Sequence, residues 1–218
     1  MYVSKHHQLT NQEAIFMLME SHPLGAWVCQ AGGALVANHV PFLLDRSRGA
    51  FGTLIGHVSR ANGVWRELSS EASSLVMFQG PQAYITPGWY PGKKEHGMVV
   101  PTWNYVVAHA HGTARAVEER SWLLDMLNRL TEAHELRQEA PWRLSDAPDS
   151  YVDKLLGAIV GIEIPIERLE GKLKASQDEA MQDRRGTVAA LQRSPREEER
   201  AIANLVKSAM DAEPPARR

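Results

Sequence analysis

The sequence contains a single cysteine, Cys29, which excludes an internal disulfide framework and a cysteine-based zinc site. No apolar run reaches the roughly 18 residues that a membrane-spanning helix needs, and no signal-like leader opens the chain, so we expect a cytoplasmic protein. Neither sign of charge dominates, because 24 Lys and Arg residues face 26 Asp and Glu residues and leave a net charge of −2. This balance argues against a protein built mainly to coat nucleic acid.

Histidine and tryptophan are more prominent than the other aromatic residues. The 218 residues are 44% hydrophobic and 23% charged, as in an ordinary globular protein with a sizeable core. The nine His and six Trp residues outnumber the five Tyr and four Phe residues, and all fifteen precede residue 143. The use of histidine and tryptophan therefore ends about two-thirds of the way along the 218 residues.

The amino-acid pattern from residue 26 to about residue 112 is typical of an all-β fold. Short runs rich in Val, Phe, Trp and Tyr are broken by Gly, Pro and Asn, and strands at this spacing favour a barrel over an α/β sheet. The later run 159–173 changes the parity of its apolar residues, which predicts one long strand with a bulge near residues 165–168. The earlier strands that we expect are 27–30, 35–44, 51–57, 75–79, 82–86 and 102–111.

Helices are expected on both sides of this β-rich region. A Ser or Thr three residues before an acidic residue predicts helix starts at Thr10, Ser150, Ser176 and Ser194, and Ser121 can cap a further helix. The fold class is therefore mainly β with flanking helices, an α+β arrangement.

The sequence predicts that the C-terminal segment is an addition to the main domain. Its last helix carries one apolar stripe, which must pack on the barrel or on a partner subunit. After residue 165 the chain has eleven basic and ten acidic residues. This nearly neutral charge does not indicate a DNA-binding surface. We expect one domain over residues 1–193, followed over residues 194–218 by an amphipathic helix and a frayed tail.

A cluster of hydrogen-bond donors follows the strand expected at 51–57. His57 ends that strand, and Ser59, Arg60 and Asn62 supply a hydroxyl, a guanidinium and an amide within four positions. A fixed bidentate cation with several neutral donors is what a bound phosphate monoester needs. The alternative is a solvated turn with one surface arginine, because short Ser-Arg segments are common.

Two further stretches combine rigid Pro or Gly turns with flat aromatic rings and polar groups. Residues 78–90 read Phe-Gln-Gly-Pro-Gln-Ala-Tyr-Ile-Thr-Pro-Gly-Trp-Tyr, and residues 101–105 read Pro-Thr-Trp-Asn-Tyr. This mixture suits a mostly apolar slot that holds a planar ring system. The alternative is core packing at strand ends, which is the commoner role of isolated tryptophans.

Two histidines share one face of the strand expected at 102–111. On an extended strand Tyr105, Val107, His109 and His111 point to the same side, so the two imidazoles could meet one metal ion or haem. No third ligand with a defined spacing follows. We therefore expect a hydrogen-bonded or partly exposed pair rather than a metal site.

Six motifs in register carry a family resemblance. In chain order they are Ala37-Asn-His-Val-Pro-Phe42, Gly56-His-Val-Ser-Arg-Ala-Asn62, Phe78-Gln-Gly-Pro81, Ala83-Tyr-Ile-Thr-Pro87, Pro101-Thr-Trp-Asn-Tyr105 and Gly171-Lys-Leu-Lys-Ala-Ser-Gln177. Each motif is weak by itself, but together they resemble the PaiB-like family, labelled FMN-binding negative transcriptional regulators. The likeness extends from Met1 to about Leu191.

The resemblance implies a split β-barrel like that of pyridoxamine-phosphate oxidases, and a homodimer with FMN in clefts at the subunit interface. In that wider fold a Ser-Arg pair at a strand end holds the ribityl phosphate, which here falls on Ser59 and Arg60. Ala61 stands where the wider fold often has lysine, so His57 or the partner subunit would replace that contact. The implied cofactor-binding residues are His39, His57, Ser59, Arg60, Asn62, Tyr84, Thr86, Trp103 and Asn104, the last four beside the isoalloxazine.

Two functions follow from this resemblance. The first is an FMN-binding transcriptional regulator or flavin-based sensor, and the second is a flavin-dependent oxidoreductase acting on a small molecule, with the reactivity supplied by the cofactor. A third and weaker interpretation is haem or metal handling through His109 and His111. The family label leaves DNA open as a partner, but the charge pattern does not support it. The sequence shows no Gly-x-Ser-x-Gly elbow, Walker loop or Rossmann fingerprint.

Overall fold

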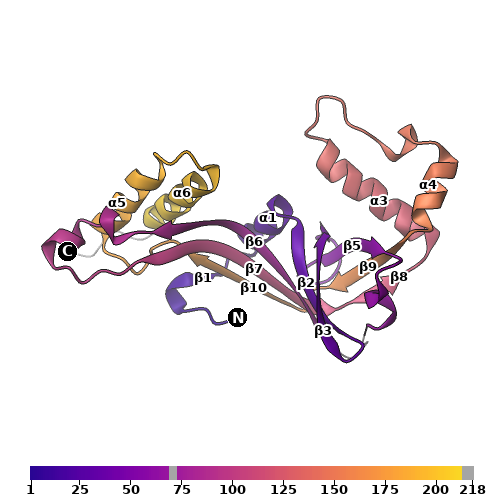
Figure 1. The fold of residues 1–218 in the computed structure, drawn as a ribbon, viewed down its shortest axis with the longest axis horizontal. Coiled ribbons are helices and arrows are strands. Elements are labelled where there is room, and N and C mark those ends of the chain that lie inside the picture. Colours follow the sequence, from indigo (N-terminus) through magenta and orange to yellow (C-terminus); the bar gives the residue numbers. More distant parts are fainter. Residues whose placement is uncertain (69–72, 213–218) are drawn as a thin grey trace. The chain divides into compact units, whose positions relative to one another are not determined.

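The structure is a computed structural model that describes residues 1–68 and 73–212 of the chain (Figure 1). The chain divides into two compact units. Unit 1 comprises residues 1–12, 79–107 and 171–218, and unit 2 comprises residues 13–78 and 108–170. Each unit is thus assembled from segments that lie far apart in the sequence.

The described strands form two sheets. The strands are β1 (Gln8–Leu9), β2 (Leu24–Ala31), β3 (Ala34–Pro41), β4 (Leu43–Asp45), β5 (Thr53–Ser59), β6 (Ser73–Ile85), β7 (Thr102–Thr113), β8 (Arg115–Val117), β9 (Ile159–Pro165) and β10 (Arg168–Lys174). One sheet has six strands in the order β1-β10-β7-β6-β2-β3, and the other has four in the order β4-β5-β9-β8. The pairs β2–β3, β2–β6, β5–β9 and β8–β9 are antiparallel.

Helices accompany both units. They are α1 (Gln12–Ser21), α2 (Gly92–Glu95), α3 (Arg120–Glu135), α4 (Asp149–Leu156), α5 (Met181–Leu191) and α6 (Glu197–Asp211), with 3-10 turns at Lys5–His7, Gly63–Arg66, Pro87–Trp89 and Leu144–Asp146. The predicted class, mainly β with flanking helices, matches this arrangement. Within the described ranges, none of these helices has both the length and the apolar character needed to span a bilayer.

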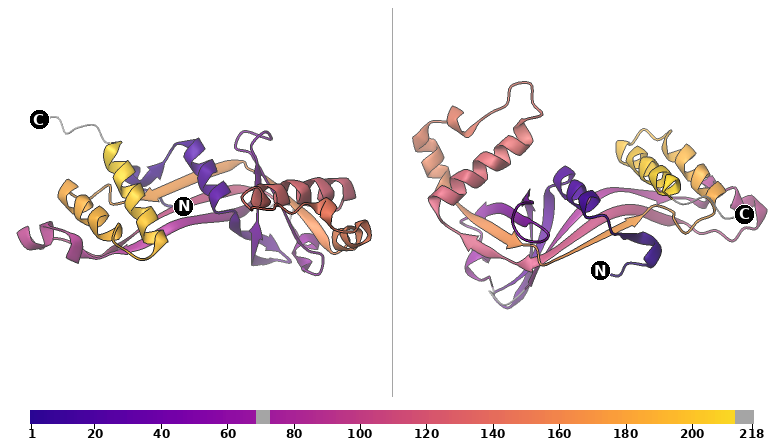
Figure 2. Two further views of the ribbon diagram at one scale, coloured as in Figure 1. Left: turned by 90° about the horizontal axis from the view of Figure 1, so that it is seen from above. Right: turned by 180° about the vertical axis from the view of Figure 1, so that it is seen from behind.

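In unit 1, helices α5 and α6 lie side by side and pack on the end of β6 (Figures 1 and 2). Ile202 and Val206 of α6 are fully buried in one apolar cluster with Ile85 of β6 and Leu191 of α5. Burial of such a side chain contributes roughly 1.5–3 kcal/mol. The apolar stripe predicted for the last helix therefore packs on this chain's own sheet.

In unit 2, helices α3 and α4 cover the four-stranded sheet. Leu123 of α3 and Leu156 of α4 pack with Ile55 of β5 in a second apolar cluster. Trp122 of α3 lies directly over Gly161 of β9, where an added Cβ would come within 2.2 Å of the indole Cζ3 atom. Glycine at position 161 thus lets this helix approach the sheet closely.

A buried carboxylate on β9 ties three segments of unit 2 together. Glu163 is 0% exposed, and Arg48 donates hydrogen bonds of 2.8 Å to both of its carboxylate oxygens. Arg115 of β8 adds a bond of 2.9 Å from its Nε atom. Burial by itself raises the pKa of Glu163, but these charged hydrogen bonds outweigh burial and hold the pKa below its ordinary value. Glu163 is therefore an ionised structural residue.

The single bulged strand predicted for 159–173 is wrong. Strand β9 ends at Pro165 and β10 begins at Arg168, and the two strands belong to different sheets. Between them the N–H of Ile166 donates to the Gly52 carbonyl at 3.0 Å, and the N–H of Glu167 donates to the His111 carbonyl at 2.8 Å. The parity change in the sequence therefore marks a crossing between sheets rather than a bulge.

Other strand boundaries also differ from the prediction. The strand expected at 35–44 is interrupted at Phe42, whose N–H donates to the Pro23 carbonyl at 2.9 Å instead of continuing the ladder. The strands expected at 75–79 and 82–86 are one continuous strand, β6, which runs through Gly80 and Pro81. Tertiary pairing thus overrides the local Gly-Pro signal.

The predicted helices are present, but several begin at other residues. Glu119 rather than Ser121 precedes α3, and Ala180 rather than Ser176 precedes α5. Ser176 has a positive φ of 58° and is 1% exposed, so it belongs to a buried turn instead of a cap. The predicted boundary between residues 193 and 194 stays a prediction, and the frayed end predicted for residues 214–218 lies outside the described residues.

Candidate functional site

The turn after β5 positions the predicted phosphate-binding cluster in unit 2. Strand β5 ends at Ser59, which is exposed, and the chain turns back so that the N–H of Asn62 donates to the Ser59 carbonyl at 2.9 Å. The N–H of Ala61 donates to Ser59 Oγ at 3.3 Å. The N–H of Arg60 donates to the Ala158 carbonyl at 2.8 Å, which anchors the turn next to the start of β9.

Arg60 is held at this turn by backbone carbonyls and one carboxylate. Its Nε donates to the Gly157 carbonyl at 3.0 Å, and its Nη2 donates to the Ile159 carbonyl at 3.1 Å. Its Nη1 donates to Glu118 Oε2 at 2.6 Å. A guanidinium has five N–H donors, so these described partners use three of them. The guanidinium is therefore oriented by the fold and keeps two donors for a further ligand.

Aromatic and amide side chains complete the surroundings of the turn. Arg60 lies with its Cζ atom 5.5 Å from the ring centre of Trp65, whose indole N–H donates to the Arg60 carbonyl at 3.2 Å. Asn62 Nδ2 donates to Asn38 Oδ1 at 2.7 Å. Asn38 Nδ2 is buried and has no hydrogen-bond partner among the described residues. His39 is the next residue along β3 and is exposed on the opposite face of that strand.

His57 is a partly buried imidazole on β5, two residues before Ser59. Burial lowers the pKa of His57, so the ring is neutral near pH 7. Its Nδ1 atom is buried without a hydrogen-bond partner in the part of the chain that the structure describes. Because such groups are normally satisfied, this atom is a place where a ligand or an ordered water would bind.

The predicted isoalloxazine residues fall on two sides of strand β7 in unit 1. Tyr84 and Trp103 are 47% and 52% exposed, and their rings meet edge to face with centroids 5.8 Å apart. Asn104 is fully buried on the other side of β7, where its Nδ2 donates to Ser176 Oγ at 2.8 Å. Thr86 accepts the Gly88 N–H through its hydroxyl at 3.2 Å. The fold therefore pairs Tyr84 with Trp103 and separates Asn104 from them.

Sequence reasoning missed two residues that shape the cluster at the β5 turn. Glu118 follows β8 and is the carboxylate partner of Arg60. Asn38 belongs to a recognised motif, but its contact with Asn62 was not predicted. No spacing signal could have identified Glu118, because strand pairing and not local sequence brings it to the turn.

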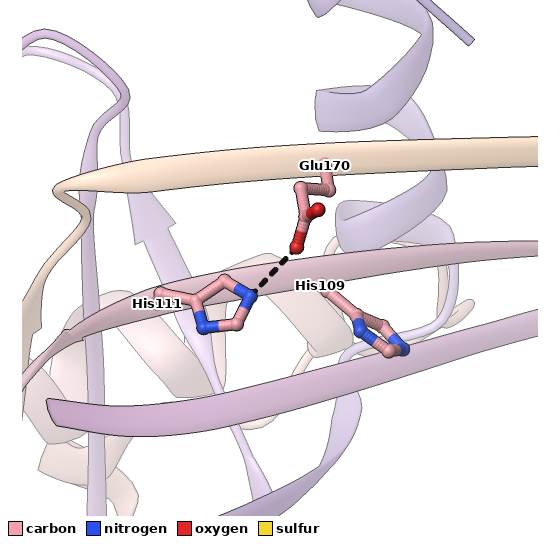
Figure 3. A group of neighbouring side chains, drawn as sticks. All are labelled: His109, His111 and Glu170. Atoms are coloured by element: carbon pink, nitrogen blue, oxygen red, sulfur yellow. Dashed lines mark hydrogen bonds and ion pairs between the residues drawn. The ribbon is translucent and has the colours of Figure 1, made fainter. Parts of the chain in front are cut away.

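The two histidines predicted on one strand face do lie together in unit 2. Their ring centroids are 6.4 Å apart, and His111 Nε2 lies 2.8 Å from Glu170 Oε2 on the adjacent strand β10 (Figure 3). One possible ligand atom from each of His109, His111 and Glu170 lies within 4.8 Å of the others. The third member of this cluster was not expected from the sequence.

The comparison with known families identifies the chain. Residues 1–168 match the family described as "Putative FMN-binding domain". The chain belongs to this family. A protein of Bacillus subtilis named Protease synthase and sporulation protein PAI 2 is 29% identical over 94% of this chain and 96% of its own length. An uncharacterized protein of Emericella nidulans is 33% identical over 95% and 96% of the two chains. The predicted PaiB-like relationship is confirmed.

Solved structures show the same fold at low sequence identity. The FAD and heme binding protein from Mycobacterium smegmatis superposes with a TM-score of 0.59 at 20% identity, covering 84% of this chain and 80% of that one. The flavocytochrome Anf3 from Azotobacter vinelandii gives a TM-score of 0.55 at 13% identity, with coverage of 79% and 72%. The predicted split-barrel fold is confirmed, although the described strands form two sheets rather than one closed barrel.

FMN is the cofactor that this family assigns to the chain. The donor set at the β5 turn fits its phosphate, because Ser59 is exposed and two N–H donors of Arg60 have no partner among the described residues. The exposed rings of Tyr84 and Trp103 suit a planar ring system. Which of these residues contact FMN stays a prediction.

Proposed function

We propose that this protein is a flavin-based sensor of the PaiB type, and that Ser59 and Arg60 hold the FMN phosphate. The observation that carries the proposal is the fixed guanidinium of Arg60. Two backbone carbonyls orient it at a strand end, two of its N–H donors have no partner among the described residues, and the exposed Ser59 precedes it in the chain. Charge-assisted hydrogen bonds of this kind are the strong contacts by which proteins bind phosphate groups.

The aromatic pair in unit 1 is the contact that we propose for the isoalloxazine ring. Tyr84 and Trp103 are large apolar side chains that remain about half exposed in the single chain. A planar isoalloxazine would cover such rings and remove their apolar area from water.

A partly exposed apolar strip in unit 2 supports the homodimer. On β2 and β6, Trp27 and Val76 face the core and are 0% exposed. Their neighbours Val28 and Leu75 point to the opposite face, where they are partly exposed and lie opposite one another in the ladder. An apolar face of this kind suits a self-complementary interface with a second copy of the chain.

The sensor role draws on the PaiB-like family label and on the similarity to the Bacillus subtilis Protease synthase and sporulation protein PAI 2. The net charge of −2 disfavours direct binding to DNA. We therefore infer that the flavin is the sensing group and that any DNA readout is weak. A gel-shift titration with DNA from upstream of the coding sequence should show only salt-sensitive, non-specific association. A sequence-specific shift would contradict the inference that DNA is not read directly.

The deciding experiment is a visible absorption spectrum of the purified protein, followed by titration with FMN. We expect a yellow protein that binds one FMN per chain, and a colourless protein that ignores added FMN would reject the proposal. Stopped-flow mixing with NADH or NADPH then separates sensor from enzyme. A sensor turns over negligibly, whereas sustained reduction with an added acceptor would establish the alternative function, a flavin-dependent oxidoreductase.

A further inference from the structure

The alternation of β7 gives two histidines a common, accessible face. Ala108 and Ala110 are fully buried, whereas His109 and His111 between and after them are only partly buried. The two imidazoles therefore project from the same side of the strand, with ring planes inclined by 60°. Neighbouring side chains at positions i and i+2 of a strand can reach one ion in this way.

Strand β10 supplies a carboxylate to the same place. Glu170 lies beside β7, with its Oε2 atom 2.8 Å from His111 Nε2, and its side chain is 22% exposed (Figure 3). One nitrogen from each histidine and one oxygen from Glu170 lie within 4.8 Å of one another. Ligand atoms on one tetrahedral zinc ion lie about 3.3 Å apart, given metal–nitrogen bonds of about 2.0–2.1 Å. Side-chain rotation would have to close the difference.

The ligand set matches the chemistry of a first-row divalent transition metal. Two neutral imidazoles and one carboxylate suit Zn²⁺, Fe²⁺, Co²⁺ or Ni²⁺, whereas Mg²⁺ and Ca²⁺ prefer oxygen ligands alone. We propose that His109, His111 and Glu170 bind one such ion and leave further coordination positions open to water or a small ligand.

Arg168 is one cation that opposes the metal. Its Nη1 donates to Glu170 Oε2 at 2.6 Å, and its Nη2 donates to His111 Nδ1 at 3.1 Å. This second contact leaves the proton of His111 on Nε2, which donates to Glu170. When a metal ion binds Nε2, the proton of His111 moves to Nδ1. Nδ1 can then no longer accept the hydrogen bond from Arg168, so Arg168 must turn away. Its side chain is 57% exposed, and exposed ion pairs are weak, so the metal can displace it.

The test measures metal binding by the FMN-loaded full-length protein after dialysis against a chelator. Zn²⁺ is titrated in competition with a chromophoric chelator, and Mg²⁺ serves as the hard-ion comparison. We expect one Zn²⁺ per chain and no binding of Mg²⁺ in its place. His109→Ala, His111→Ala and Glu170→Gln should each weaken Zn²⁺ binding at least tenfold, whereas His134→Ala, at an exposed position on α3, should not change it.

Two further measurements separate a metal site from an ion-pair cluster. Zn²⁺ should raise the melting temperature of the wild type and not that of the Glu170→Gln variant, because a ligand that binds the folded state stabilises it. Arg168→Gln should tighten Zn²⁺ binding several-fold, because it removes a competing cation. Absence of stoichiometric Zn²⁺ binding, or equal affinity in the wild type and the Glu170→Gln variant, would overturn the proposal. Weaker Zn²⁺ binding by Arg168→Gln would likewise count against it.

Discussion

The guanidinium of Arg60 donates a 2.6 Å hydrogen bond to the carboxylate of Glu118, 58 positions further along the chain. The Glu118 side chain is 54% exposed, so this ion pair is weak and a phosphate can compete with it. Two backbone carbonyls continue to orient Arg60 when the carboxylate leaves. Arg60 and Glu118 thus form an arrangement that an incoming anion can open without unfolding the turn.

Removal of Arg60 should weaken the binding of FMN far more than that of riboflavin. A charge-assisted hydrogen bond contributes about 1.5–3 kcal/mol, so Arg60→Ala should lower FMN affinity at least tenfold, as about 1.4 kcal/mol is a factor of ten. Glu118→Gln should raise FMN affinity up to about fivefold, because it removes an exposed competitor worth about 0–1 kcal/mol. Quenching of flavin fluorescence measures both affinities.

Riboflavin is the matched control for these two variants, because it has the same ring system without the phosphate. Its affinity should be the same in the wild type, Arg60→Ala and Glu118→Gln. Equal losses for FMN and riboflavin in Arg60→Ala would mean that Arg60 supports the fold of the site rather than the phosphate.

Removal of the Trp103 ring should weaken FMN and riboflavin equally. Trp103 is 52% exposed and contacts Tyr84 edge to face, so Trp103→Ala should leave stability nearly unchanged. The lost ring contact is worth about 0.5–1.5 kcal/mol, or about two- to tenfold in affinity. Trp142→Ala, at a residue that is 44% exposed in the segment between α3 and α4, is the control. Unchanged flavin affinity in Trp103→Ala would place the isoalloxazine elsewhere.

Loss of the Glu163 charge should destabilise the protein strongly. Glu163 is 0% exposed between Arg48 and Arg115, and breaking a buried ion pair costs about 3 kcal/mol or more. Glu163→Gln should therefore shift the midpoint of urea unfolding to clearly lower urea. Glu20→Gln removes one of the two exposed carboxylate partners of Arg46 and should cost less than about 1 kcal/mol. Similar midpoints for both variants would contradict a structural role for Glu163.

The same carboxylate should make stability depend on pH in the acid range. The pKa of folded Glu163 lies below its ordinary value, so its contribution is complete above the unfolded pKa of about 4.3 and is lost as pH falls through the folded pKa. The unfolding free energy of the wild type should fall more steeply below pH 4.3 than that of Glu163→Gln. Parallel pH profiles would show that Glu163 titrates alike in both states.

A methyl group at position 161 should disturb the contact between α3 and its sheet. The Cβ of Gly161→Ala would lie 2.2 Å from the Trp122 ring, so the helix must move or the ring must turn. Overpacking of this kind costs about 1–3 kcal/mol. Gly63→Ala adds its Cβ where no atom lies within 4 Å, and it should leave the urea midpoint nearly unchanged. No loss in Gly161→Ala would mean that Trp122 has room to adapt.

Local patterns predicted the kinds of element better than their connections. The stripe of Ile202 and Val206 predicted a helix with one apolar face, and α6 buries that face in unit 1. The parity change of the apolar residues in the run 159–173 is real, but its interpretation as a bulge was wrong. A parity change records only that the buried side switches, and a bulge and a crossing between sheets produce the same switch in sequence.

For the candidate site, too, the sequence predicted the local residues but not their distant partners. Ser59, Arg60 and Asn62 are so close in sequence that one turn had to bring them together, and their motif is one of the six that together indicated the FMN-binding family. Glu118 beside Arg60 and Glu170 beside His111 carry no signal of their own, because each comes from a distant segment. The sequence by itself determined the donor chemistry and the family. Only the tertiary structure decided which carboxylate faces which cation or imidazole, because pairing between distant strands depends on sheet order and register, which local sequence does not encode.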